Sequence, residues 1–356
     1  MKKLLVIILS VFAFSTKAQV VRKYSNEFLN IGVGANNLGM GNAVVASTAD
    51  VTSAYWNPAG LLKVKSNFQA GLMHSEYFAG IAKYDYGAVV KPLDENSAAA
   101  FSIVRFGVDN IPNTTQLIDA NGQINYDRVT TFSAADYAFL FSYAKKMKIE
   151  GLHVGANAKV IRRKVGDFAG AWGFGLDAGA QYQKNGWLFG AMAKDVTTTF
   201  NAWSFDLTDE MKEAFVLTGN EIPTSSVELT LPKLILGAAR NFSYKKFTAL
   251  TELNMDATFD GKRNVLIKSK AVSLDPKLGV QIGYSNIVFL RGGLSNFQKI
   301  KEEGGKTVNT IQPNFGVGVK IRAFTLDYAL TNVGENVGLL SNVFSLKIDL
   351  NPKQTR

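Results

Sequence analysis

Apolar and polar residues alternate with a period of two through most of the chain from residue 66 onward. Residues 343–350 show the pattern best, because Phe344 and Leu346 fall on one face while Lys347 and Asp349 fall on the other. Successive side chains of a β-strand point to opposite faces, so each such segment predicts a strand with two unlike faces. Three further segments repeat the pattern clearly, namely residues 152–160, 275–284 and 313–322.

Charged residues recur on the polar face of these segments. Burying them in a dry core would be costly, whereas in a transmembrane barrel the polar face lines a wet lumen and the apolar face meets lipid. Fourteen segments qualify as strands: 66–75, 79–91, 97–107, 132–145, 149–162, 170–183, 186–195, 229–241, 246–256, 275–285, 286–296, 313–322, 323–331 and 341–350. The chain is therefore predicted to be all-β, a 14-stranded antiparallel transmembrane β-barrel over residues 66–350, with a periplasmic tail at 351–356.

The connections between these segments sort by length. Short turns follow the even-numbered segments, at 92–96, 146–148, 185–186, 242–245, 285–286 and 322–323, and long connections follow odd-numbered ones, at 108–131, 196–228, 257–274 and 297–312. Outer-membrane barrels have short periplasmic turns and long extracellular loops, and an even strand count leaves both termini periplasmic. We therefore expect a multi-pass protein of a Gram-negative outer membrane whose long loops are extracellular.

The N-terminus has the pattern of a secretion signal. Lys2 and Lys3 precede the apolar residues 4–14, and Ala18 ends a small-residue exit, so residues 1–18 are predicted to be a signal peptide. No later apolar run is long enough for a spanning helix. Removal of Lys2, Lys3 and Lys17 lowers the formal net charge by three, from +10 to +7.

A basic exported protein seldom meets nucleic acid. Its expected counter-charges are outer-membrane lipid headgroups and lipopolysaccharide phosphates, and the alternative is loop lysines that only aid solubility. Cysteine is absent, and the two histidines, His74 and His153, lie far apart in the sequence. His74 is followed by Ser75 and Glu76, but neighbours on a strand face opposite ways, so they form no triad. We expect no catalytic residue, no metal site, no cofactor and no enzymatic activity.

A segment rich in small residues precedes the strands. Residues 32–61 carry few charges and end in the turn Asn57-Pro58-Ala59-Gly60. The segment is predicted to form a small helical hatch inside the lumen, as part of an N-terminal tether and hatch over residues 19–65. Two helical pieces are expected, one over 37–47 and one that starts from Asp50 as N-cap and stops by Asn57. The glycines resemble no nucleotide-binding motif, because the required strand and spaced acidic residue are missing.

The hatch supplies most of the candidate site residues. A structural or gating role is expected for Gly39, Met40, Gly41, Trp56, Asn57, Pro58, Ala59 and Gly60. A lining for a hydrophobic ligand is expected from Leu38, Val44, Val45 and Tyr55, with ordinary packing of the hatch as the alternative. Whether the hatch only seals the barrel or also gates a path stays open at this point.

The longest loop contains a helix start at Thr208-Asp209-Glu210-Met211. It predicts a short amphipathic lid over the outer mouth, or a solvated loop helix that only packs on its neighbours. The candidate partner-binding residues of this loop are Asp206, Asp209, Glu210, Met211 and Phe215.

Residues 28–61 also resemble a known family. The matching residues are Phe28-Leu29-Asn30-Ile31-Gly32, Gly34-Ala35, Leu38-Gly39-Met40-Gly41-Asn42-Ala43 and Ala54-Tyr55-Trp56-Asn57-Pro58-Ala59-Gly60-Leu61. They resemble the PorV/PorQ family, outer-membrane proteins of the Bacteroidetes type IX secretion system that are similar to the FadL transporters. The chain departs from the family pattern at Asn36 and at Ala49-Asp50, which favours a PorV-like paralogue. The resemblance implies a fourteen-stranded barrel with an N-terminal hatch.

Two functions follow as hypotheses. The resemblance implies a non-enzymatic component of protein secretion or surface assembly, which binds cargo or the protein partners of an outer-membrane complex. The alternative is a FadL-type channel for long-chain fatty acids or other hydrophobic small molecules, which needs an apolar pocket between hatch and wall and a gap in a strand. The cargo, the small molecule and the oligomeric state stay open.

Overall fold

The computed structural model describes residues 25–117, 123–301, 307–332 and 340–352. The predicted signal peptide lies outside these residues. Fourteen strands form the barrel: β1 (Ser66–Tyr77), β2 (Ala82–Pro92), β3 (Ser97–Asn113), β4 (Thr130–Lys146), β5 (Leu152–Val165), β6 (Ala169–Lys184), β7 (Trp187–Lys194), β10 (Lys233–Tyr244), β11 (Phe247–Thr258), β13 (Ser273–Tyr284), β14 (Val288–Lys301), β15 (Thr307–Ile321), β16 (Phe324–Thr331) and β17 (Ser341–Pro352). The predicted fold class and strand number are confirmed.

Every neighbouring pair in this wall is antiparallel, and β17 pairs with β1 to close the barrel. The pairing β7–β10 bypasses β8 (Thr199–Phe205) and β9 (Ser226–Thr230), which extend the sheet beyond the barrel from the first half of β6. Two bulges interrupt the register, one between Val108 and Ile111 and one between Ser295 and Gln298. β13 and β14 pair only over Leu278–Tyr284 and Val288–Leu294, so residues 273–277 of β13 have no partner on β14. No helix among the described residues is long and apolar enough to cross a membrane.

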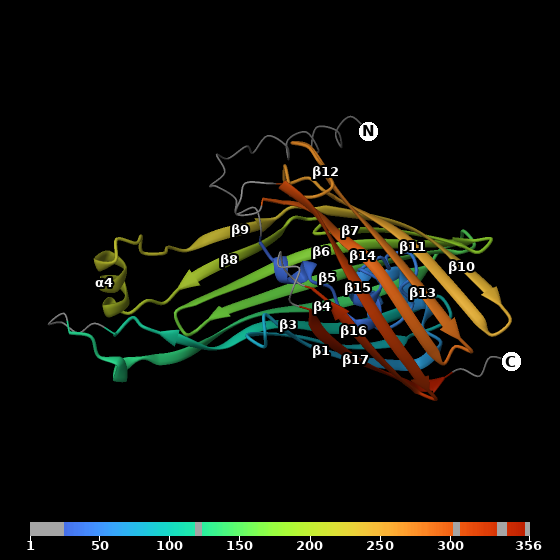
Figure 1. The fold of residues 1–356 in the computed structure, drawn as a ribbon, viewed down its shortest axis with the longest axis horizontal. Coiled ribbons are helices and arrows are strands. Elements are labelled where there is room, and N and C mark those ends of the chain that lie inside the picture. Colours follow the sequence, from blue (N-terminus) through green and yellow to red (C-terminus); the bar gives the residue numbers. More distant parts are fainter. Residues whose placement is uncertain (1–24, 118–122, 302–306, 333–339, 353–356) are drawn as a thin grey trace, which may run out of the picture.

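The two ends of the barrel differ. At one end, six connections of two to five residues join β2–β3, β4–β5, β6–β7, β10–β11, β13–β14 and β15–β16. We call this the short-turn end. The opposite, long-loop end carries β8, β9, β12 (Ile267–Lys268) and the helices η3 (Tyr126–Arg128) and α4 (Asp209–Leu217). Figure 1 shows the extended strands and α4 projecting far beyond the barrel at this end.

The outer face of the wall is apolar. Phe344, Phe315 and Leu72 expose 57%, 58% and 63% of their surface, although they lie in the middle of strands. Such exposure suits contact with lipid rather than with water. The inward face carries many polar and charged residues, and a large share of them is buried. The prediction that the inward residues line a wet lumen is therefore wrong over much of the wall. Lys159 and Asp177 are buried there, because the hatch fills the space that water would occupy.

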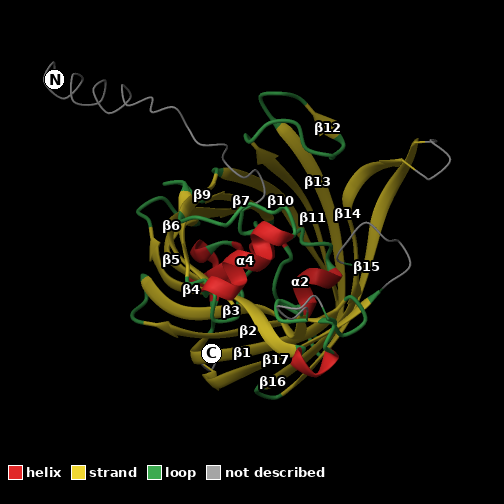
Figure 2. Ribbon diagram, turned by 90° about the vertical axis from the view of Figure 1, so that its left-hand side faces the viewer, coloured by secondary structure: helices red, strands yellow, loops and turns green. Residues whose placement is uncertain are grey.

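The hatch lies inside the barrel, as Figure 2 shows for α2. It consists of η1 (Glu27–Asn30), α2 (Ala35–Gly39), α3 (Ser53–Trp56) and η2 (Pro58–Lys63). The helix predicted over 37–47 is wrong after Gly39, because Gly41 and Asn42 adopt positive φ angles of 63° and 64° that an α-helix does not accept. Helix α3 also begins later than expected, at Ser53, with Thr52 rather than Asp50 as its N-cap.

The largest apolar core joins the hatch to one side of the wall. Phe28, Leu38, Tyr55, Trp56 and Leu61 of the hatch pack into one buried cluster, mostly with inward residues of β1 to β5 and also with one residue each of β16 and β17. The wall contributes Tyr77, Tyr84, Tyr86, Val90, Val104, Leu140 and Ile161 to this cluster. Burial of this much apolar surface holds the hatch against β1–β5.

Candidate functional site

Glycines of the wall face the hatch around most of its circumference. A Cβ built on any of them would overlap hatch atoms: these are Gly71, Gly155, Gly179, Gly190, Gly237, Gly279, Gly293 and Gly316. They lie on β1, β5, β6, β7, β10, β13, β14 and β15. We call this set the glycine belt. Because none of its members carries a side chain, the hatch packs directly on the wall, with its backbone at Gly155, Gly190, Gly279, Gly293 and Gly316 and with its side chains at the other three.

Polar contacts hold the hatch in place as well. The backbone N–H groups of Ala46 and Ser47 donate to the two carboxylate oxygens of the fully buried Glu252, at 2.7 and 3.1 Å. Lys347 Nζ lies 2.6 Å from Asp50 Oδ2. Asn157 of β5 donates to the carbonyl of Ala54 at 2.9 Å. These bonds join the hatch to β5, β11 and β17.

The residues predicted as the hatch signature make close contacts and hydrogen bonds within the hatch and with the wall. Gly39 packs on Gly316, and Gly41 packs on Gly293. The Trp56 indole donates to the Val33 carbonyl at 2.8 Å. The side chain of Asn57 donates to Val45 O at 2.9 Å and to Ala180 O at 3.0 Å, while its Oδ1 accepts from Ala59 N at 3.2 Å. The turn Asn57-Pro58-Ala59-Gly60 is thus hydrogen-bonded both to the hatch and to the wall.

The residues proposed to line a hydrophobic pocket are all buried. Leu38 and Tyr55 belong to the main core cluster, and Val45 packs on Met192 and Ile235. Val44 belongs to the core and also lines a cavity. The geometry of this set is that of packing, with Val44 alone of the four placed at an open space of appreciable size.

The part of the longest loop that carries the candidate partner residues lies far from the hatch. Thr208 caps α4 by accepting from Met211 N at 3.3 Å, and Asp209 pairs with Lys212 at 2.9 Å. No residue of α4 is buried, and Figure 1 places the helix at the tip of the β8–β9 extension. This position suits a solvated loop helix better than a lid.

The histidines lie on the wall. His74 Nδ1 is 2.7 Å from Asp85 Oδ1 on the outer face, while the next residue, Ser75, is buried on the inner face. His153 lies at the start of β5. The expected opposite orientation of His74 and Ser75 is therefore present.

Two cavities lie on opposite sides of the hatch. The short-turn cavity, of about 360 Å³, is lined by hatch residues that include Met40 and by β1, β11 and β13–β17. The long-loop cavity, of about 470 Å³, is lined by Asn42 and by β10 and β13–β16. Residues 40–42 separate the two spaces, where Met40 and Gly41 pack on Gly279 and Gly293. Most of the residues that line the two cavities are polar, and the short-turn cavity also has an apolar side. Neither cavity is lined by β2–β7.

A third space lies outside the barrel. It is an apolar groove of about 790 Å³ on β1, β2, β3 and β15–β17, lined by outward residues such as Leu72, Val317 and Phe344. The strands around it pair without a gap. The wall beneath this groove therefore shows no lateral opening. On the other side of the barrel, β13 and β14 pair only between Leu278–Tyr284 and Val288–Leu294, and the long-loop cavity lies where their unpaired halves diverge.

Buried ion pairs are the feature that sequence analysis missed. Lys159 Nζ lies 2.9 Å from Asp177 and 2.6 Å from Asp195, and Asp256 accepts both Lys233 and Lys277 at 2.6 and 2.7 Å. The alternation places these residues on the inner face but gives no register between strands. The pairs could have been found only with that register in hand.

No protein-family model and no curated protein matches the sequence. Solved structures do match. The CymD monoaromatic hydrocarbon channel aligns over 90% of this chain and 98% of its own, with a TM-score of 0.57 at 14% identity. The Ralstonia pickettii toluene transporter TbuX aligns over 90% and 98%, with a TM-score of 0.53 at 14% identity. A Pseudomonas aeruginosa FadL homologue aligns over 89% and 98%, with a TM-score of 0.52 at 11% identity.

At such identities the likeness shows the fold. The chain has the FadL-like fold, a closed outer-membrane-type barrel with an internal hatch. Two of these three similar structures are described as a channel and a transporter, and none as an enzyme. The likeness supports the FadL-like part of the resemblance and does not reach the PorV/PorQ family.

Proposed function

We propose that the protein is an outer-membrane channel for hydrophobic or amphiphilic small molecules, closed by its hatch in this structure. The observation that carries the proposal is the pair of cavities on either side of residues 40–42, inside a barrel whose fold is shared with a hydrocarbon channel and a toluene transporter. The long-loop end is then extracellular and the short-turn end periplasmic. Outer-membrane lipid and lipopolysaccharide surround the apolar outer face.

Together the two cavities would form a path through the barrel that residues 40–42 interrupt. Each is of the size of an ordinary small-molecule site. Met40 lines one cavity and Asn42 the other, and the wall beside them carries Gly279 and Gly293, so a local shift of residues 40–42 is the movement that would join the two spaces. The polar lining favours an amphiphilic molecule over a bare hydrocarbon, because buried amides and charges are poorly satisfied by an apolar guest.

A reversible lock tests whether the hatch moves. Ala35 of the hatch donates its N–H to Ser345 of β17 at 2.8 Å, and the chain has no cysteine. Ala35→Cys/Ser345→Cys therefore introduces one pair of thiols at a hatch–wall contact. We expect purified protein in liposomes to pass decanoate when reduced and to pass less when oxidised. Equal flux in both states, or flux no higher than in empty liposomes, contradicts the proposal.

A second candidate function is a role in type IX secretion, as a PorV-like protein that binds cargo or complex partners. The resemblance of residues 28–61 supports it, and so does α4, where Val216 and Leu217 are 65% and 86% exposed with nothing covering them among the described residues.

Affinity purification from native membrane in mild detergent tests this second function. Deletion of residues 207–223 is the cleaner variant than removal of the whole loop, because Asn201 and Glu228 of β8 and β9 contact Ser25 of the hatch. Large partners lost on this deletion would support secretion, and recovery of the barrel alone would count against it.

A further inference from the structure

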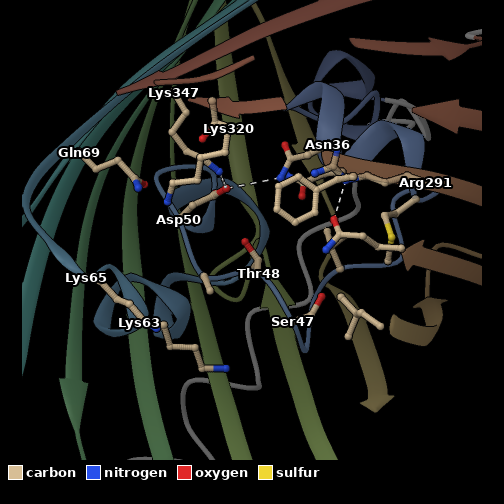
Figure 3. A pocket seen from close by; sticks show the side chains of 18 of the residues that line it. Asn36, Ser47, Thr48, Asp50, Lys63, Lys65, Gln69, Arg291, Lys320 and Lys347 are labelled. Carbon is tan, nitrogen blue, oxygen red and sulfur yellow. Dashed lines mark hydrogen bonds and ion pairs between the residues drawn. The ribbon is translucent and has the colours of Figure 1, made fainter. Parts of the chain in front are cut away.

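The short-turn cavity is strongly basic. Five cationic side chains line it, Lys63 and Lys65 from the hatch and Arg291, Lys320 and Lys347 from the wall, whereas Asp50 and Asp349 are its only carboxylates. Figure 3 shows hatch and wall lysines around the same space. The excess of positive charge is concentrated where the wall and the hatch leave room for a guest.

The three cationic side chains that come from the wall each have a partner. Lys347 pairs with Asp50 at 2.6 Å, and Arg291 pairs with Asp327 at 2.7 Å and with Gln281 at 2.6 Å. Lys320 lies 3.5 Å from Asp349 and is about half exposed at the rim. These pairs consume the carboxylates of the cavity.

The hatch lysines have no such partner. Among the described residues, neither Lys63 nor Lys65 takes part in a hydrogen bond or an ion pair with a stated distance. Lys63 is partly buried, and burial lowers its pKa to about 8. The charge of Glu252 reaches Lys63, but the Glu252 oxygens accept from the backbone of Ala46 and Ser47. Lys63 and the exposed Lys65 are therefore available to an anion that enters the cavity.

The rest of the lining adds an apolar side. Met40, Val44, Leu250 and Phe289 border the same space. With a volume of about 360 Å³, the cavity accommodates an anionic head group and a short apolar portion. The charge and the apolar side together define an amphiphilic guest.

We propose that the short-turn cavity is a binding site for the carboxylate or phosphate group of a small amphiphilic molecule, held by Lys63 and Lys65 with Lys320 at the rim. As a statement about substrate chemistry, it rests on the proposed channel. Binding does not require the hatch to open. The binding measurement can therefore fail while the flux measurement succeeds, or the reverse, and the two proposals are tested separately.

The test is isothermal titration calorimetry on the purified full-length barrel in a non-ionic detergent, with decanoate and inorganic phosphate as probes. We expect Lys63→Gln/Lys65→Gln to weaken binding by about tenfold or more, because charge-assisted hydrogen bonds are the strong ones. Lys320→Gln, which leaves the hatch untouched, weakens it less. Lys145→Gln/Lys148→Gln, which removes two exposed lysines near the β4–β5 turn, is the matched control and leaves the affinity unchanged.

The two probes distinguish the source of the anion. Tighter binding of decanoate supports an amphiphile, and equal binding of both probes supports the anion site with free phosphate as its guest. Binding of neither probe overturns the proposal. Equal losses in the hatch and control variants also overturn it, since they would reduce the effect to overall charge. The electrophoretic shift between folded and heated barrel confirms that each variant is folded.

Discussion

At the scale of single residues, Glu252 is the most consequential wall side chain for the hatch. Its carboxylate accepts two backbone N–H groups, which have no other acceptor among the described residues. A buried donor without an acceptor costs about 1–3 kcal/mol, so Glu252→Ala is expected to lower the free energy of unfolding by about 2–4 kcal/mol. Urea unfolding from lipid vesicles measures this, and Glu252→Gln, which keeps one acceptor oxygen, should lose less. Equal losses in the two variants would contradict the explanation.

The protonation of Lys63 should make the affinity of the short-turn cavity for an anion depend on pH. Its pKa of about 8 means that the ammonium is fully charged below pH 7 and loses its proton as the pH rises through 8. Glu252 and His153 are the charged or titratable groups whose fields reach it, and above pH 7 an ordinary imidazole is already neutral. We therefore expect decanoate affinity to fall between pH 7 and 9. The profile of Lys63→Gln should be flatter, and identical profiles would exclude Lys63 as the titrating group.

At the scale of elements, the glycine belt makes the fit between β14 and the hatch testable. A Cβ at Gly293 overlaps Gly41, whereas a Cβ at its neighbour Gly292 meets no atom within 4 Å. Gly293→Val is expected to displace residues 40–42 and to raise the conductance of single barrels in planar bilayers. Gly292→Val, on the opposite face of the same strand, is the control. A conductance increase in both variants would point to damage of β14 rather than of the seal.

The closing strand β17 carries a prediction for the molecule as a whole. Phe344 is 57% exposed on the outer face, while its neighbour Ser345 faces the hatch. An arginine on the lipid face costs about 2–4 kcal/mol at mid-membrane depth. Phe344→Arg should therefore slow insertion of the folded barrel into vesicles, measured by protease protection. Asn342→Arg, nearer the strand end, should insert at close to the normal rate, and an equal delay would argue against a lipid-facing role for Phe344.

Most of this architecture is predictable from sequence because strand alternation is a local signal. The fourteen segments, the hatch and its turn at Asn57–Gly60 follow from period, composition and turn residues. What could not be predicted depends on contacts between distant residues. The ion pairs of Lys159 need the register of β5, β6 and β7, and the end of α2 depends on the positive φ of Gly41 and Asn42 beside Gly293.

The candidate site was harder still. The hatch lysines Lys63 and Lys65 are unremarkable in sequence, since basic residues also occur throughout the loops. Only the fold shows that they face Lys320 and Lys347 across one cavity. Conversely, Leu38 and Tyr55 look like pocket residues in sequence but serve the core.

The hatch is seated off-centre, and this divides the circumference of the barrel into two sectors with separate duties. Strands β1–β5 hold it through the apolar core, while β13–β16 border both cavities. Changes of preference for one molecule over another can then accumulate on the cavity sector while the anchoring sector stays intact. Re-engineering this barrel for a new guest accordingly begins on the cavity-lining side chains of β13–β16, with Gly279, Gly293 and Gly316 kept because the hatch packs on them.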